Sequence, residues 1–353
     1  MKRYEFTGET KKVGLFGTIT VKRIRATETF GIVKIGDLGG WIEKEGNLSC
    51  ENDAWVYGHA QVYGDAKVYG NAKIYGNAKV YGNAKIYGHA EVHGDAEVCG
   101  HADVCGNAEV YGDAEICGNA QVRGDAEVCG HADVCGHAEV YDDAQVRGDA
   151  EVYGNAKIYG NAQVHGDAQV RGDAEVCGHA DVCGHAEVYG DAEICGNAQV
   201  RGDAEVCGHA DVCGHAEVYD DAQVRGDAEV YGNAKIYGNA QVHGDAEVCG
   251  DAEVCGHAEV CGNAEILQAR HLLVIGPAGS RNSFTTFFRN KDNGITVKCG
   301  CFLGRINKFI EKVQETHGEN RYALVYQAAV EVAKIHIDLS GQEAAGIEGS
   351  EEH

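Results

Sequence analysis

Closely spaced cysteines and histidines are the residues of this 353-residue sequence that most readily suggest chemistry. The segment CGHADVCGH occurs three times, at 129–137, 177–185 and 207–215. Thiolate and imidazole groups at such spacing are ligands that Zn²⁺ prefers. In each segment, however, the Cys is expected on a strand and the His at a turn, and successive six-residue units are expected on different faces. We therefore predict no metal site and no cofactor.

A second group of polar side chains follows Gly279, near the C-terminal end. The candidate ligand-binding residues are Arg281, Asn282, Ser283, Thr285, Thr286 and Arg289. Guanidinium and hydroxyl groups together can bind an anion, a nucleotide or a carboxylate. Cys299 and Cys301 are possible reactive thiols, with His317 nearby as a base, although a nucleophilic thiol needs a lowered pKa. The alternative interpretation is a strand face without a ligand, and no catalytic residue is predicted.

A six-residue repeat, A-x-[VI]-x-G-[NDH], surrounds the Cys/His segments and extends from Ala54 to Ile266. All 36 first slots hold Ala, and all 36 third slots hold Val or Ile. Because successive strand residues point to opposite sides, the first and third slots face a core and the second and fourth face water. Glycine then forms a corner, since it adopts positive φ freely. Such units become stable only by stacking on one another.

This pattern resembles the hexapeptide repeat of left-handed parallel β-helices of the trimeric LpxA-like kind. In that family three hexads make one triangular coil, so the 36 hexads imply a left-handed parallel β-solenoid of about 12 coils. Here glycine comes one position later than in the usual pattern, which leaves the handedness open. With GDLGGWIEKEGNLS at 36–49 and GPAGSRNSFTTFF at 276–288, nearly the whole chain resembles uncharacterised hexapeptide-repeat proteins of bacteria and phages. That resemblance implies no particular chemistry.

Residues 18 apart are expected to stack in such a coil. The fourth slot, which holds 14 Tyr and 13 Cys, then forms exposed ladders such as Cys99, Cys117 and Cys135. Residues 108–168 are identical to 186–246, an offset of 78 residues or 13 hexads. Because 13 is not a multiple of three, the second copy is turned by one face. A site that needs one fixed face would not survive this duplication, so we interpret the repeat as a scaffold.

The predicted fold class is an all-β parallel β-solenoid with a small α+β C-terminal domain. The predicted parts are a β-rich N-terminal cap at 1–50, the hexapeptide-repeat β-helix at 51–275, an α+β domain at 276–340 and a flexible tail at 341–353. Strands are expected at Thr18–Ile24 and Phe30–Ile35 in the cap, and Asn293-Gly294 predicts a hairpin turn in the α+β domain. Two helices follow, the second at about 320–338 with Val325, Ala329, Val332 and His336 on one face.

Negative charge is concentrated in the repeat. The chain has 30 Lys and Arg against 55 Asp and Glu, a net charge of −25. Residues 51–266 have 11 basic and 39 acidic residues, or −28, whereas 1–50 have +3 and 267–353 have 0. This field repels phosphate backbones, so no direct nucleic-acid binding is expected. With neither a long apolar run nor an apolar signal core, we expect no membrane contact and a cytoplasmic location with reduced thiols.

These features predict a non-enzymatic structural scaffold or binding protein. The repeat would act as a spacer, and the C-terminal domain would recognise a protein partner; a homodimer or homotrimer is compatible with the repeat. One alternative is an acyltransferase-like hexapeptide-repeat enzyme, since enzymes that resemble this β-helix bind CoA or an acyl carrier between subunits of a trimer. The other is an acidic DNA-mimic inhibitor. The uninterrupted hexads disfavour the first, and Lys67, Lys73, Lys79 and Lys85 disfavour the second.

Overall fold

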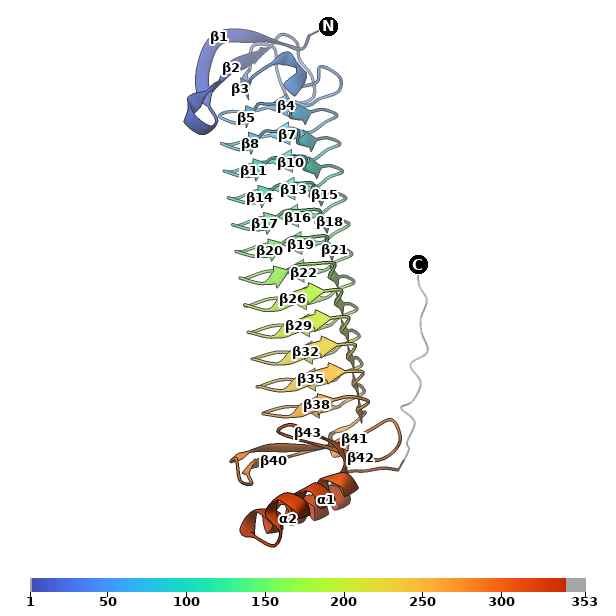
Figure 1. The fold of residues 1–353 in the computed structure, drawn as a ribbon. Coiled ribbons are helices and arrows are strands. Elements are labelled where there is room, and N and C mark those ends of the chain that lie inside the picture. The colour runs from blue at the N-terminus through green and yellow to red at the C-terminus, as the bar shows by residue number, and fades with distance from the viewer. Residues whose placement is uncertain (1, 341–353) are drawn as a thin grey trace. The chain divides into compact units, whose positions relative to one another are not determined.

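The computed structural model describes residues 2–340, which form a parallel β-solenoid and a small α+β domain. The solenoid has about 13 turns and three parallel sheets, and the small domain has a four-stranded sheet and two helices, which confirms the predicted fold class. The chain divides into two compact units, Met1–Gly190 and Asp191–His353. The first unit holds the N-terminal cap and the earlier turns, and the second holds the later turns and the small domain (Figure 1).

Each hexad contributes one short strand from its second and third residues. The first is β4 (Trp55–Val56) and the last is β39 (Glu265–Ile266), and the strands between them begin at six-residue steps and have two residues each, with five exceptions. The longer strands are β26 (Glu187–Gly190), β29 (Glu205–Gly208), β32 (Gln223–Gly226), β35 (Gln241–Gly244) and β38 (Glu259–Cys261). Strand length is short because the glycine corner follows two residues after the aliphatic slot.

Parallel strands of successive turns pair in an 18-residue register. In β11 (Glu97–Val98) and β14 (Glu115–Ile116), Glu97 lies opposite Glu115. The Glu97 N–H donates to the Ala114 carbonyl at 2.9 Å, and the Cys99 N–H donates to the Ile116 carbonyl at 2.8 Å. The predicted turn of three hexads is therefore confirmed.

The repeat slots divide between core and surface as the pattern predicts. The alanines of the first slot are at most 3% exposed, and the Val and Ile side chains of the third slot are at most 1% exposed. The tyrosines and cysteines of the fourth slot are half-buried on the outside, except for Tyr63, Cys249 and Cys261. Tyr63 is covered by Val13 and Val21 of the N-terminal cap. Each hexad thus contributes one alanine and one valine or isoleucine to the core of the solenoid.

The glycine corners need both positive φ and the absence of a Cβ. At Gly112, φ is +78°, and a Cβ would lie 2.7 Å from the Gly130 carbonyl oxygen on the next turn. Asp142 and Asp220 replace glycine at two corners with φ near +60°. The Asp142 carboxylate accepts a hydrogen bond from the Gly160 N–H at 3.3 Å, and Asp220 makes the equivalent contact at 3.2 Å. At both corners, the hydrogen bond that the Asp side chain accepts offsets part of the strain of a non-glycine residue at positive φ.

The duplicated segment changes face as predicted. Strand β13 (Glu109–Val110) of the first copy belongs to the sheet that contains β4. Its counterpart in the second copy is β26, which belongs to the sheet that contains β5 (Gln61–Val62). Identical side chains are therefore presented on different sheets.

The cap supplies one turn that the hexad count omits. Strands β1 (Tyr4–Val13) and β2 (Ile19–Ala26) are antiparallel, and β2 pairs with β3 (Leu38–Ile42). Strand β3 in turn pairs in parallel with β5, so the solenoid begins before the first hexad and exceeds the predicted 12 coils. The strand expected at Phe30–Ile35 is wrong, because Phe30 and Val33 form only an isolated bridge across a tight turn. Short 3₁₀ helices lie at Leu15–Gly17, Glu45–Asn47 and Ala269–His271.

The small domain begins earlier than its sequence suggests. Its antiparallel sheet has the strand order β40 (Leu272–Ala278), β41 (Ser283–Arg289), β42 (Ile295–Cys299) and β43 (Phe302–Arg305). The apolar residues at 272–275, which we expected to close the last coil, instead pair with β41. The hairpin across Asn293-Gly294 is confirmed, and Asn293 adopts positive φ there.

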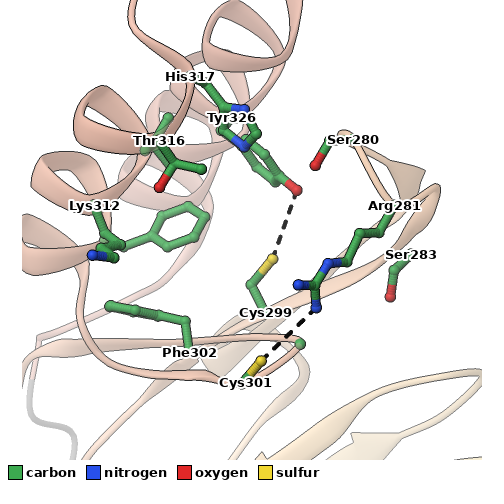
Figure 2. A pocket seen from close by; sticks show the side chains of 13 residues that line it. Ser280, Arg281, Ser283, Cys299, Cys301, Phe302, Lys312, Thr316, His317 and Tyr326 are labelled. Carbon is green, nitrogen blue, oxygen red and sulfur yellow. Dashed lines mark hydrogen bonds between the residues drawn. The ribbon is translucent and has the colours of Figure 1, made fainter.

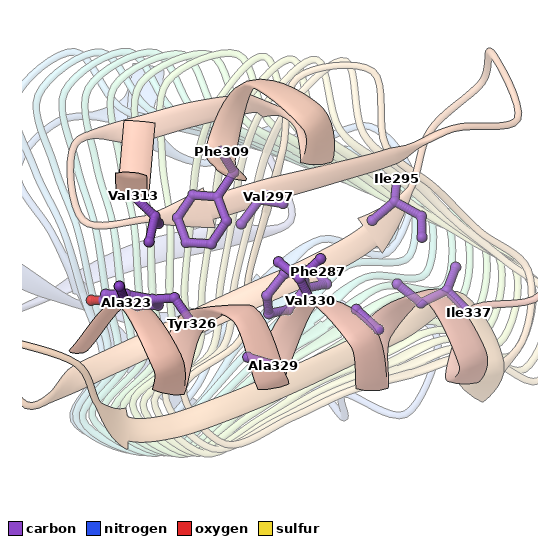
Figure 3. Close-up of a cluster of buried hydrophobic side chains, with 11 residues drawn as sticks. Phe287, Ile295, Val297, Phe309, Val313, Ala323, Tyr326, Ala329, Val330 and Ile337 are labelled. Carbon is purple, nitrogen blue, oxygen red and sulfur yellow. The ribbon is translucent and has the colours of Figure 1, made fainter. Parts of the chain in front are cut away.

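Helices α1 (Ile306–His317) and α2 (Arg321–His336) cover one face of this sheet (Figure 3). Phe309 of α1 packs between Phe287 and Tyr326, edge to face with both rings. The face of α2 that holds Val325 and Val332 is not the buried one, since these side chains are 42% and 49% exposed. The buried residues are Ala323, Tyr326, Ala329, Val330 and Ala333. In the described part of the chain, neither helix has the length and apolar character needed to cross a membrane; the predicted tail at 341–353 lies outside that part.

We expect Gly112→Ala to destabilise the first unit more than Gly58→Ala does. Both positions have positive φ, a conformation that costs an L-residue about 1–2 kcal/mol. A Cβ at Gly58 would find its nearest neighbour at 3.8 Å, whereas one at Gly112 would clash at 2.7 Å. Thermal and urea denaturation of the two variants would measure the difference, and equal midpoints would contradict the close packing of corners.

Candidate functional site

A pocket of about 420 Å³ lies in the small domain, between helix α1 and the turn regions of the sheet (Figure 2). Its apolar wall comes from Phe302, Phe309 and Val313. Its polar groups come from the β40–β41 turn, the β42–β43 turn and the helices. These polar residues are Ser280, Arg281, Ser283, Cys299, Cys301, Lys312, Thr316, His317 and Tyr326. The volume is within the range that small ligands occupy in proteins, about 300–1,000 Å³.

Tyr326 joins the two sides of the pocket. Its ring stacks on His317 with centroids 5.8 Å apart, and its hydroxyl accepts a hydrogen bond from the Cys299 thiol at 3.9 Å. Burial, with a smaller contribution from Cys299, raises the pKa of Tyr326 to about 12, so the phenol stays protonated at neutral pH. Gly279 is required opposite the hydroxyl, because a Cβ there would lie 2.0 Å from it.

The charged groups around the pocket are basic. The Arg281 guanidinium points across the opening toward Cys301, with Nη1 3.8 Å from Sγ (Figure 2). Within the described residues Arg281 has no carboxylate partner. Lys312 pairs with Glu315 at 3.0 Å, an exposed ion pair of the kind that contributes little. Among residues 2–340, no Asp or Glu lines the pocket, so a negatively charged ligand would meet the positive charge of Arg281 without a competing carboxylate.

The structure brings part of the predicted ligand-binding set to this pocket. Arg281 and Ser283 line it, whereas Asn282 holds the turn between them with φ of +50°. Thr285 is buried beneath the pocket, where its hydroxyl donates to Cys299 Sγ at 3.2 Å. Cys301 is exposed and Cys299 is half-buried. Their predicted reactivity stays a prediction.

Thr286 and Arg289 point away from the pocket and attach the small domain to the last solenoid turns. Thr286 Oγ1 accepts a hydrogen bond from the Glu259 backbone N–H at 3.0 Å. The Arg289 guanidinium, only 6% exposed, lies 3.1 Å from Glu265 Oε2. Burial and this guanidinium lower the pKa of the neighbouring His271. Alternation along β41 places Thr286 on the face opposite Ser283 and Thr285, whereas Arg289 shares their face and is separated from the pocket because it lies at the far end of the strand.

Sequence reasoning missed the pocket residues that come from the helices. Lys312 and Thr316 lie four apart on α1, and Tyr326 lies on α2. The signal for the first two was their position beside the apolar residues Phe309 and Val313 of the same helix. No local signal marked Tyr326, because only packing of the two helices places it opposite Gly279.

The histidines of the CGHADVCGH segments lie at corners, as predicted, and contact polar side chains of neighbouring turns. His131 Nδ1 lies 3.6 Å from Asp113 Oδ2, and His185 Nδ1 lies 3.5 Å from Asp167 Oδ2. His137 Nε2 lies 3.5 Å from the Asn119 amide. In these contacts the imidazoles meet carboxylates and amides rather than thiols.

The fourth-slot ladders form on the outside of the solenoid as predicted. Tyr57 stacks on Tyr75 with ring centroids 4.5 Å apart, and further tyrosine pairs stack at 18-residue spacing. Cys117 lies between Cys99 and Cys135; burial and these two thiols raise its pKa to about 12. All 16 cysteines lie in the described part of the chain, and none forms a disulfide. A thiol with so high a pKa is a poor nucleophile at neutral pH.

Carboxylates in the second slot fall into two electrostatic classes. Burial and the carboxylates of Asp133 and Glu97 raise the pKa of Glu115. By contrast, a hydrogen bond from Lys157 lowers the pKa of Glu175, which it reaches at 2.6 Å. Ionisation of Glu115 therefore destabilises the fold, whereas ionisation of Glu175 stabilises it.

We expect Glu115→Gln to raise the melting temperature at pH 7 and Glu175→Gln to lower it. The Glu115 effect should disappear below the ordinary Glu pKa of 4.5, because Glu115 is then protonated in both the folded and unfolded states. The Glu175 effect should persist to lower pH, because the pKa of Glu175 in the folded state lies below the ordinary Glu pKa. Thermal denaturation between pH 3 and pH 8 would measure both, and shifts of the same sign at pH 7 would contradict the assignment.

No family model matches the sequence, and a search of curated proteins finds no match. Of the predicted resemblance to hexapeptide-repeat proteins, the structure shows the β-solenoid with its 18-residue periodicity.

Proposed function

We propose that this chain is a non-enzymatic binding protein whose small domain captures a carboxylate-bearing segment of a protein partner, with the solenoid acting as a structural spacer. The observation that carries the proposal is the pocket, into which Arg281 faces without a carboxylate partner within residues 2–340. Arginine and a carboxylate form strong charge-assisted hydrogen bonds. An unpaired guanidinium at a concave site is accordingly a natural anchor for such a group.

The apolar wall narrows the ligand class. Phe302, Phe309 and Val313 lie beside Arg281 in the same pocket, so a ligand that fills it presents apolar surface next to its carboxylate. A polypeptide C-terminus that ends in an apolar residue has this arrangement, because the terminal carboxylate and the last side chain share one carbon. The pocket has room for one or two such residues.

The charge distribution agrees with this placement. Residues 51–266 have a net charge of −28, whereas residues 267–353 have a net charge of 0. Since like charges repel, a carboxylate approaches the small domain more easily than the flank of the solenoid. The two-residue strands of the solenoid carry no inserted loop between β4 and β39, which suits a spacer.

We expect Arg281→Ala to weaken binding of peptides with an apolar last residue and a free C-terminal carboxylate by about 10-fold to 100-fold, as the loss of a hydrogen bond to a charged group does. A library of such peptides, each paired with its C-terminal amide, would be screened against the full chain by fluorescence polarisation. The amides should bind as weakly to the wild type as the acids bind to the variant.

Arg305→Ala is the matched control, because Arg305 lies in the same domain, pairs with Asp292 at 2.9 Å and is outside the pocket. This variant should bind like the wild type. Equal affinity for acid and amide forms, or an Arg281→Ala variant that binds as the wild type does, would refute carboxylate capture.

A further inference from the structure

Three metal-ligating side chains meet on the outer surface of the first unit. The imidazole of His165, the carboxylate of Asp181 and the thiol of Cys183 place one ligand atom each within 4.8 Å of one another. His165 follows β22 (Gln163–Val164), and the other two lie at β25 (Asp181–Val182). The two strands pair in register, so neighbouring turns hold all three groups on one sheet.

The repeat itself produces this meeting. A fourth-slot side chain at position i reaches the second-slot side chain at i+16 and the fourth-slot side chain at i+18. Tyr159 and Glu175 show the same i to i+16 contact at 3.1 Å elsewhere in this unit. The expectation of no metal site rested on the corner histidines alone. The sequence signal for this cluster is a fourth-slot histidine followed 16 residues later by an acidic residue and 18 residues later by a cysteine.

The carboxylate of this cluster is poorly satisfied. Asp181 Oδ1 lies 2.9 Å from His165 Nε2, yet it is a buried atom without a hydrogen bond of acceptable geometry. Gln163, which precedes Asp181 by one turn in the same row, is neutral and supplies no cation. In the described residues Asp181 pairs with no Lys or Arg. Its negative charge is therefore available to a bound cation.

We propose that His165, Asp181 and Cys183 bind one Zn²⁺ ion. Imidazole, carboxylate and thiolate are the three protein ligands that zinc uses, at about 2.0–2.3 Å, and three of them leave a fourth position for water. Side chains of His165 and Asp181 are 30% and 37% exposed, so solvent can reach that position. On binding, the Cys183 thiol releases its proton to solvent and the sulfur forms the bond to zinc. Small side-chain rotations bring atoms that now lie within 4.8 Å to bonding distance.

Two of the other triplets at these repeat positions serve as internal comparisons. In the first, Tyr87 replaces the imidazole beside Asp103 and Cys105. That position has no nitrogen ligand, and Lys85 Nζ lies 3.5 Å from Asp103 Oδ1. Such a triplet offers zinc at most two ligands.

The second comparison triplet is His243, Glu259 and Cys261 in the second unit. Here Lys298 Nζ lies 2.8 Å from Glu259 Oε1, so an ammonium group already neutralises the carboxylate. Cys261 is only 1% exposed, which closes the position that solvent or a metal would enter. This second triplet is therefore expected to bind zinc weakly or not at all.

The test is a titration of the reduced full-length protein with Zn²⁺ and, separately, with Co²⁺, in the presence of a competing chelator. The wild type should show one tight site per chain, with the visible absorption of tetrahedral Co²⁺ and a thiolate charge-transfer band. His165→Tyr, Asp181→Asn and Cys183→Ala should each lower the affinity of that site for the metal by about 10–100-fold or more. Loss of a residue that only supports a ligand already costs about that much, and these three residues are the ligands themselves. His165→Tyr installs the residue that occurs naturally at position 87, so its fold should be retained.

His243→Tyr and Cys105→Ala are the matched controls, and both should leave the tight site unchanged. Circular dichroism melts of every variant without metal would establish that folding is intact. Absence of a tight site in the wild type, or a tight site that survives all three ligand substitutions, would overturn the proposal. In that case His165 and Asp181 form an ordinary surface ion pair, and any residual binding belongs to the other thiols.

Discussion

Backbone hydrogen bonds between successive turns, each from an N–H to the carbonyl 17 residues later, are the interaction on which the solenoid depends. They form only if each strand carries a small and an aliphatic side chain inward and if each corner turns through positive φ. The corner is the tighter requirement, because glycines of successive turns approach so closely that a Cβ at Gly94 would lie 2.7 Å from the Gly112 carbonyl oxygen. The two aspartates found at corners both accept a hydrogen bond from the next turn, which shows what a tolerated exception needs.

The outward slots escape this constraint and hold the chemical diversity of the repeat. Each fourth-slot side chain lies near the second-slot residue 16 positions later and the fourth-slot residue 18 positions later, so a single substitution can create an ion pair, a ring stack or a ligand cluster. Arg123 with Glu139, Tyr63 with Tyr81, and the His165 cluster are products of one geometry. Duplication by 13 hexads repeated the Arg123–Glu139 pair as Arg201–Glu217 on a different sheet without disturbing the core.

The sequence predicted the solenoid almost completely because one short rule governs every turn. It failed where structure depends on contacts distant in sequence. Strand β1 is mostly polar and was not expected. Its residue Val13 is buried only because it packs against Val21 and Tyr63, which are distant in the sequence. The buried side of α2 was not predicted, because the helix meets the sheet through its small residues, such as Ala329 and Ala333.

The candidate site was predicted in part for the same reason. Arg281 and Ser283, which the sequence places at one turn, line the same pocket. Arg289 and Thr286 share their strand but face the solenoid, where they attach the small domain to it. Tyr326 could not be predicted, since nothing in the sequence near it indicates the glycine across the pocket.

The 18-residue stacking of outward residues can be measured directly with pyrene labels. In a background in which every other cysteine is replaced by serine, one variant keeps Cys117 and Cys135, which lie on one sheet after β14 and β17 (Asp133–Val134). A second variant keeps Cys117 and Cys129, 12 residues apart and on different sheets. The solenoid predicts strong excimer fluorescence from the first pair and monomer fluorescence from the second. Equal excimer signals, or excimer emission from the second pair alone, would contradict it.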